Sequence, residues 1–146
     1  MSVDNQIPKQ VLLLGYFGLI PFVLFGFGVW LIPDAFLQTA ANFLITYSAC
    51  ILTFMGAIHW GVAMKDRAHS MQLALSIVPA IVAWLSLNIV SPWSYSILIV
   101  SFVVLCIADG MAVKKRLVPA WYPKLRIPLT GMVVLSLISG AFATIR

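Results

Sequence analysis

Two ionisable residues, His59 and Asp109, lie inside long apolar runs of the sequence. A charge is costly inside a bilayer, so an ionisable residue in a membrane-spanning helix is a candidate for function. His59 precedes Lys65 by six residues, and Asp109 precedes Lys114 by five. At a helical rise of 1.5 Å per residue these offsets correspond to roughly 9 Å and 7.5 Å. The two side chains are therefore expected at nearly the same depth, where they could pair across two helices.

A buried histidine and aspartate allow several kinds of chemistry. The pair can act as a polar clamp that fixes helix register, or as a proton relay or ligand site. Asp109 can equally meet Arg126, near the start of the last helix, or Arg116, seven residues on along its own helix. His59 and His69 are ten residues apart without a carboxylate cluster nearby, so we expect no metal site and no cofactor. We assign no catalytic residue.

Aromatic and basic residues complete the candidate sites. A lipophilic ligand needs an apolar, often aromatic-lined pocket with a few polar groups. The candidate residues for a ligand site or polar clamp are Tyr16, His59, Trp60, Trp84, Asp109 and Arg126. A second group combines basic side chains with interfacial aromatic rings and is expected to contact lipid headgroups. It consists of Lys114, Lys115, Arg116, Trp121, Tyr122 and Lys124.

The elements that must position these residues are transmembrane helices. Of the 146 residues, 62% are hydrophobic and 9% are charged, whereas about a quarter of the residues of a soluble domain are charged. Five apolar runs are each long enough to cross a hydrocarbon core about 30 Å thick. We therefore expect an all-α, polytopic bundle of five transmembrane helices, forming a single transmembrane domain over residues 1–146. The expected helices cover 11–32, 40–64, 71–90, 93–113 and 127–145.

The charges between the helices predict the orientation. Alternating the loops across the membrane places eight basic residues on one side and leaves Arg146, with the acidic Asp34, on the other. The eight are Lys9, Lys65, Arg67, Lys114, Lys115, Arg116, Lys124 and Arg126. Because cytoplasmic loops are enriched in Lys and Arg, we expect the N-terminus in the cytoplasm and the C-terminus outside. The net charge of +5 is explained by orientation and lipid contact, and no nucleic-acid partner is expected.

Prolines and small residues add expectations about helix shape and packing. Pro21 and Pro79 fall within expected helices, and each should free the carbonyl four residues earlier, at Phe17 and Leu75. Small residues at every fourth position let helices approach closely in lipid. Two such faces are Ala49, Thr53, Ala57 and Gly61 on the second helix, and Ser136, Gly140 and Thr144 on the fifth.

Four strings along the chain resemble one family. They are GYFGLIPF at 15–22, FMGAIHWG at 54–61, PAIVAWL at 79–85 and PAWYPKLRIPLT at 119–130. Together and in this order they resemble the domain-of-unknown-function family numbered 3429, which includes bacterial inner-membrane proteins and the mitochondrial transmembrane protein 69. The resemblance implies a membrane location that would suit energy metabolism or complex assembly. It implies no established reaction.

These observations favour a multi-pass protein of the bacterial inner (cytoplasmic) membrane. We expect first a non-enzymatic accessory or assembly protein, whose partners are the phospholipid bilayer and another membrane protein complex. The alternative is a protein that binds a lipophilic ligand, a quinone or a lipid, in its cytoplasmic half. A small proton or solute transporter is a further alternative. No sequence feature identifies an enzymatic reaction.

Overall fold

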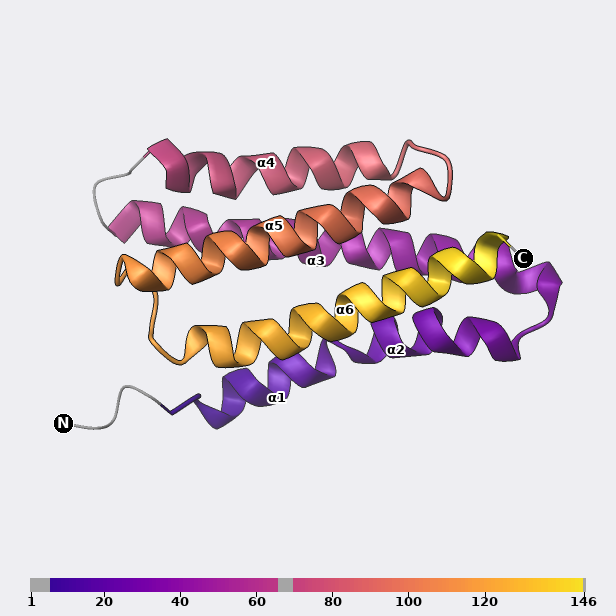
Figure 1. Cartoon of the computed structure of the whole chain (residues 1–146), viewed down its shortest axis with the longest axis horizontal. Coiled ribbons are helices and arrows are strands. Elements are labelled where there is room, and N and C mark those ends of the chain that lie inside the picture. Colours follow the sequence, from indigo (N-terminus) through magenta and orange to yellow (C-terminus); the bar gives the residue numbers. More distant parts are fainter. Residues whose placement is uncertain (1–5, 66–69, 146) are drawn as a thin grey trace.

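The computed structural model describes residues 6–65 and 70–145, and the secondary structure within these ranges is helical (Figure 1). The elements are α1 (Lys9–Phe17), α2 (Ile20–Phe27), η1 (Gly28–Leu31), η2 (Asp34–Phe36), α3 (Leu37–Lys65), α4 (Ser70–Ser86), α5 (Trp93–Lys114) and α6 (Tyr122–Ile145). The expected all-α bundle is confirmed.

The helices run side by side along the long axis of the molecule (Figure 1). The most extensive contact joins α3 and α4, while α5 packs against α3, α4 and α6. On the other side of the bundle, α2 packs against α6 and α3, and α1 packs against α6. The largest fully buried side chains are Tyr95, Phe22 and Phe102. Together with buried side chains of α3 and α6, they form a core where α2, α3, α5 and α6 meet.

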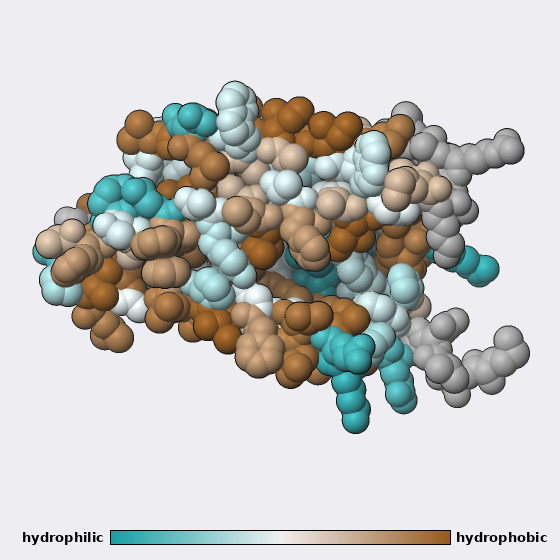
Figure 2. Space-filling view, turned by 180° about the vertical axis from the view of Figure 1, so that it is seen from behind, coloured by the Kyte–Doolittle hydropathy of each residue, from teal (hydrophilic) through white to brown (hydrophobic). Residues whose placement is uncertain are grey.

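Several helical segments are long and apolar enough to cross a membrane. They are Lys9–Leu31, Asp34–Met64, Trp93–Lys114 and Tyr122–Ile145. The remaining expected crossing corresponds to the shorter apolar helix Gln72–Ser86. Hydrophobic side chains cover most of the middle of the face drawn in Figure 2, as a surface in contact with lipid tails requires. Arg67 and Arg146, which enter the orientation argument, lie outside the described residues, so the orientation stays a prediction.

The first membrane segment is interrupted, which corrects the expectation of one continuous helix. α1 ends at Phe17, and α2 begins at Ile20. Pro21 occupies one of the first positions of α2, where a proline is tolerated because its missing N–H has no helical partner. The Tyr47 hydroxyl donates a hydrogen bond to the Gly18 carbonyl at 3.0 Å. The carbonyl that finds a polar neighbour at this break is therefore that of Gly18, and not that of Phe17 as expected.

Two other helix ends differ from the expected positions. α4 ends at Ser86, so the connection to α5 is longer than the expected Ser91-Pro92. α6 begins at Tyr122 and not at residue 127. Pro123 suits the first turn of a helix, whereas the charges that follow it had been assigned to a loop. The early start places Arg126 inside the helix, where it is buried.

The expected small-residue faces have different outcomes. Ser136 on α6 is fully buried, as the expectation for the last helix requires. On α3, Ala49 is buried in the core, whereas Thr53, Ala57 and Gly61 are exposed, so only the first member of the predicted face packs inside the bundle. α3 turns the face that carries His59 inward instead. The last three small residues of this face of α3 are thus left on the outside of the bundle.

Gly26 of α2 lies very close to Ser136 of α6. A Cβ atom at position 26 would stand 2.7 Å from the Ser136 carbonyl oxygen. Because this obstacle is backbone, we expect Gly26→Ala to lower the free energy of unfolding by about 1–3 kcal/mol, the usual cost of overpacking. Gly131→Ala is the matched control, since a Cβ there meets nothing within 4 Å. Unfolding by sodium dodecyl sulfate in mixed micelles measures both, and equal effects would contradict the close contact of α2 and α6.

Candidate functional site

Buried polar side chains from four helices form a hydrogen-bonded chain, which we call the His59 network. His59 Nδ1 lies 2.7 Å from Gln72 Oε1, and His59 Nε2 lies 2.9 Å from Asp109 Oδ1. Arg126 Nε donates a hydrogen bond to Asp109 Oδ2 at 2.7 Å. Helices α3, α4, α5 and α6 contribute one member each. The most exposed members, Gln72 and Arg126, are only 5% exposed, so the network lies in the interior of the bundle.

A glycine lets two of these helices approach each other closely. Gly56 lies about one turn before His59 on α3, and a Cβ at that position would be 3.0 Å from the Ser76 carbonyl oxygen of α4. Gln72 lies one turn before Ser76 and is therefore brought within reach of the His59 ring. A glycine inside a helix costs stability relative to alanine. The close contact of α3 and α4 explains its presence here.

The charge of the His59 network depends on the Gln72 amide. With Gln72 Oε1 facing His59 Nδ1 and Asp109 Oδ1 facing His59 Nε2, both ring nitrogens face acceptors and must donate, which makes the ring an imidazolium. If the amide turns over, Gln72 Nε2 donates to Nδ1 and the ring is neutral. With Asp109 ionised and Arg126 charged, the network then carries one net positive charge or none. One proton on His59 separates the two states.

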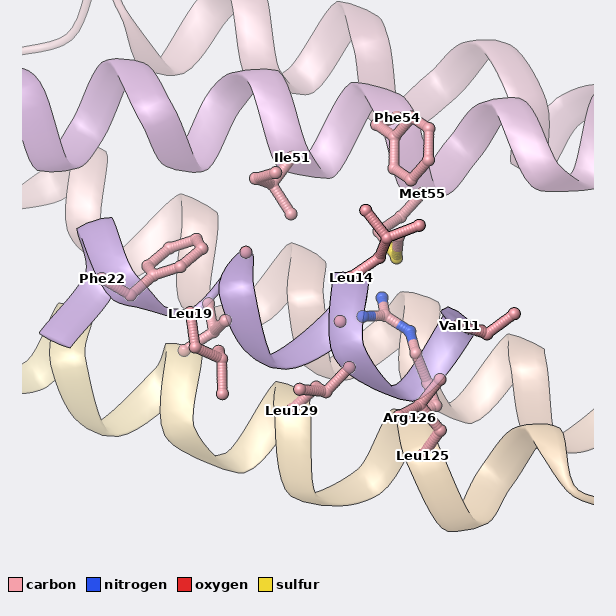
Figure 3. Close-up of a pocket in the computed structure, with 13 residues that line it drawn as sticks. Val11, Leu14, Leu19, Phe22, Ile51, Phe54, Met55, Leu125, Arg126 and Leu129 are labelled. Atoms are coloured by element: carbon pink, nitrogen blue, oxygen red, sulfur yellow. The ribbon is translucent and has the colours of Figure 1, made fainter. Parts of the chain in front are cut away.

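An apolar cavity of about 280 Å³ lies beside the network (Figure 3). It is lined by Val11, Leu14, Gly15, Gly18, Leu19, Phe22, Ile51, Phe54, Met55, Leu125, Arg126, Leu129 and Val133. Its walls come from α1, α2, α3 and α6 together with the break between α1 and α2. Figure 3 shows the Arg126 guanidinium extending from α6 into the space between these elements. The cavity and the His59 network therefore share one residue.

Arg126 is the one charged residue in the cavity lining. Its Nε atom is engaged by Asp109. Its Nη2 atom is buried and has no hydrogen-bond partner within the described part of the chain. A buried donor without a partner costs about 1–3 kcal/mol, and more when the group is charged. The cavity thus combines an apolar wall with one cationic residue that has an unpaired hydrogen-bond donor.

Three of the candidate ligand residues are not brought to this site. Tyr16, Trp60 and Trp84 are 50%, 47% and 64% exposed, and none of them lines the cavity. Trp60 follows His59 directly, and adjacent residues on a helix point in directions about 100° apart. The ring therefore faces outward while the imidazole faces inward. In a bilayer such an exposed aromatic ring meets lipid and needs no partner inside the bundle.

The expected headgroup residues lie on and around the connection between α5 and α6. Lys114, Lys115, Arg116 and Lys124 are exposed, whereas Trp121 and Tyr122 are half-buried. Trp121 and Tyr122 contact each other with ring centroids 6.2 Å apart. Contact of these side chains with lipid headgroups stays a prediction.

Arg116 does not continue the helical face that carries Asp109. α5 ends at Lys114, and Arg116 has a positive φ of 57°, a backbone region that non-glycine residues seldom adopt. Of the two arginines considered as partners for Asp109, Arg126 is the one in contact.

Sequence reasoning overlooked Gln72, which hydrogen-bonds His59 Nδ1. A signal was present, because Gln72 is a polar residue near the start of an otherwise apolar run and such residues usually find an interhelical partner. The cavity had no comparable signal, since its lining is made of ordinary aliphatic side chains. Within the described residues, no group of three His, Cys, Asp or Glu side chains is placed to hold a metal ion. His69 lies outside the described residues.

A helical chain with several apolar segments of bilayer-spanning length is a polytopic membrane protein. It belongs to the family described as protein of unknown function (DUF3429), which matches residues 7–142, and the expected family is thereby confirmed. The chain is 32% identical over 141 residues to transmembrane protein 69 of Xenopus tropicalis. This similarity covers 91% of the chain and 54% of the relative, so the chain spans about half the length of that curated protein. No solved structure matches the chain.

Proposed function

We propose that this membrane protein binds a lipophilic ligand in the cavity beside α1. The ligand places an acceptor oxygen against Arg126 and its hydrocarbon part against the aliphatic lining. The observation that carries this proposal is Arg126, a residue of the cavity wall whose buried Nη2 atom lacks a partner among the described residues. A ligand oxygen would relieve the cost of that unpaired donor.

The position of α1 supports entry of such a ligand from the bilayer. α1 contains no buried residue, and it packs against α6. Leu14 of α1 is 72% exposed and yet contributes to the cavity lining. A wall with so little buried surface can separate from the bundle at small cost. We therefore propose that the ligand reaches the cavity sideways, past α1.

The proposal also includes the orientation of the protein in the membrane and the membrane in which it lies. The cavity lies in the half of the bundle that includes the start of α6, next to the basic connection between α5 and α6. If that connection is cytoplasmic, as the distribution of Lys and Arg indicates, the ligand site lies in the cytoplasmic half. We propose the bacterial inner membrane as the location.

An accessory or assembly role is the second proposal, and three outward small residues of α3 favour it. Thr53, Ala57 and Gly61 are exposed, and a Cβ at Gly61 would meet nothing within 4 Å. Small residues let a partner helix approach closely in lipid. Crosslinking from cysteines placed at these positions, followed by identification of the captured protein, tests this role. Capture of no protein across the set of positions would argue against it.

A photoreactive long-chain alcohol tests the ligand proposal in a site-specific way. We expect wild-type protein in phosphatidylcholine nanodiscs to be labelled at cavity residues such as Leu14 and Met55. Arg126→Lys keeps a cation for Asp109 but loses the guanidinium geometry. We expect it to reduce labelling about tenfold, since a hydrogen bond to a charged group contributes roughly 1.5–3 kcal/mol.

Arg116→Lys, an exchange at an exposed position, is the matched control and should leave the labelling unchanged. Labels confined to lipid-facing side chains such as Trp84, which is 64% exposed, would contradict the proposed site. Equal labelling of both variants would show that Arg126 does not bind the ligand oxygen.

A further inference from the structure

We propose that the ligand is an acidic amphiphile with a single hydrocarbon chain, and that protonation of His59 strengthens its binding by balancing the anionic headgroup. This inference rests on the proposed ligand site and names its chemistry. The charges of the His59 network, the unpaired donor of Arg126 and the size of the cavity support it.

Few charged or titratable groups lie around His59. α5 contributes Asp109 and α6 contributes Arg126, while α4 contributes the uncharged Gln72. The Tyr122 hydroxyl of α6 is buried beside Asp109. α2, which also packs against α3, carries no titratable side chain. Within the described residues, the charge of this interior is therefore set by one aspartate, one arginine and the protonation of His59.

The hydrogen-bond geometry favours an anion as the missing partner. Both nitrogens of His59 face oxygen atoms, Gln72 Oε1 and Asp109 Oδ1, which is the arrangement of an imidazolium. Asp109 then balances only one of the two cations. The excess positive charge is buried, and Arg126, whose Nη2 atom has no partner among the described residues, lines the cavity. An anionic headgroup at this atom would restore neutrality, which buried charges require.

When His59 is neutral, the interior does not favour an anionic ligand. With one proton fewer, Asp109 and Arg126 already balance, and an added anion would leave a net negative charge in the interior. A neutral oxygen, such as that of an alcohol or a carbonyl, would bind equally well in both states. The affinity for an anion, but not for a neutral ligand of the same length, should therefore fall as pH rises through the titration of His59.

The cavity size indicates one chain. Its volume is about 280 Å³, just below the roughly 300–1,000 Å³ of ligand pockets in general. The lining is aliphatic apart from Phe22, Phe54, Met55 and Arg126, so it suits a flexible hydrocarbon. A diacyl lipid would have to leave its second chain outside the cavity. A fatty-acid-like carboxylate matches both the volume and the single free donor.

Two photoreactive probes of equal chain length test this inference, an alkyl sulfonate and an alkyl alcohol. The sulfonate keeps its charge across the pH range, so a pH effect reports on the protein. Labelling of the cavity is measured in nanodiscs at about pH 5.5 and about pH 8.5, on either side of the ordinary titration of histidine near 6.5. We expect the sulfonate to label about tenfold more strongly at the lower pH, within the usual range of coupling between sites. The alcohol should label equally at both values.

His59→Gln is the matched variant, because its amide retains hydrogen-bonding capacity without a titratable charge. It should abolish the pH dependence of the sulfonate, and labelling by the alcohol verifies that the cavity of this variant is intact. The wild-type protein alone already shows whether the ligand is acidic. Cavity labelling by the alcohol but not by the sulfonate would overturn the acidic ligand and leave the proposed ligand site standing. If neither probe labels the cavity, both the acidic ligand and the proposed ligand site are contradicted.

Competition between the sulfonate probe and unlabelled lipids tests the assignment of a single-chain ligand. A free fatty acid should displace the sulfonate at lower concentration than phosphatidylglycerol does. Stronger displacement by phosphatidylglycerol would overturn the single-chain assignment. Sulfonate labelling that is strong but independent of pH in the wild type would overturn the role of His59.

Discussion

Replacing Asp109 by leucine should lower the free energy of unfolding by about 3–5 kcal/mol, the usual result of breaking a buried ion pair by removing one partner. Asp109 accepts hydrogen bonds from His59 Nε2 at 2.9 Å and from Arg126 Nε at 2.7 Å. Without the carboxylate, both partners lose their acceptor, and the Arg126 cation stays buried without its counterion. The measurement is reversible unfolding by sodium dodecyl sulfate in mixed micelles.

The double variant Asp109→Leu, Arg126→Leu is the control for this mechanism. It removes both charges, so we expect it to be more stable than the single variant, because an apolar pair in place of a buried ion pair is often nearly neutral. A loss below about 1 kcal/mol for the single variant would instead match a surface ion pair. A further loss in the double variant would also contradict the buried pairing.

Replacing Ile51 by tryptophan should reduce cavity labelling by the alcohol probe more than about tenfold, which corresponds to at least about 1.4 kcal/mol of binding free energy. Ile51 lines the cavity from α3, and the larger ring would fill space that the ligand needs. The His59 network is not touched by this change, so the variant separates ligand binding from the stability of the polar cluster.

Cys50→Trp is the matched control for the filled cavity. It places the same ring one position earlier on α3, at an exposed residue that does not line the cavity. We expect labelling at the wild-type level. If both variants lose labelling equally, the tryptophan acts through a general disturbance of α3 and the cavity is not the binding site.

The juxtaposition of His59 and Asp109 could be inferred from sequence because helices have a fixed rise and basic residues mark where they leave the membrane. That reasoning places the two residues at the same depth, and in the structure His59 Nε2 lies 2.9 Å from Asp109 Oδ1. Arg126 was expected only near the start of the last helix, since the charges around it resemble a loop. In the structure α6 begins at Tyr122. Arg126 therefore lies within the helix and reaches the interior.

The rest of the site depends on how each helix is rotated about its axis and how its side chains pack. In a helix that is apolar on nearly all sides, the sequence pattern does not show which face turns inward. α3 carries two plausible inward faces, one with Thr53 and Ala57 and one with His59, and the first is exposed in the structure. An apolar residue can face lipid or core at similar cost in a membrane. For this reason the sequence did not show that Trp60 and Trp84 are exposed on the outside of the bundle. The break between α1 and α2 contributes to the cavity wall, whereas the sequence had been read there as one continuous helix containing Pro21.

The ligand site is tested most directly by native mass spectrometry of the protein extracted gently from its own membrane. We predict a wild-type species that retains one amphiphile of lipid or fatty-acid mass, together with an Ile51→Trp species that has lost it and a Cys50→Trp species that keeps it. A wild-type protein without any bound small molecule, or the same bound masses in all three species, would contradict a ligand site at Arg126.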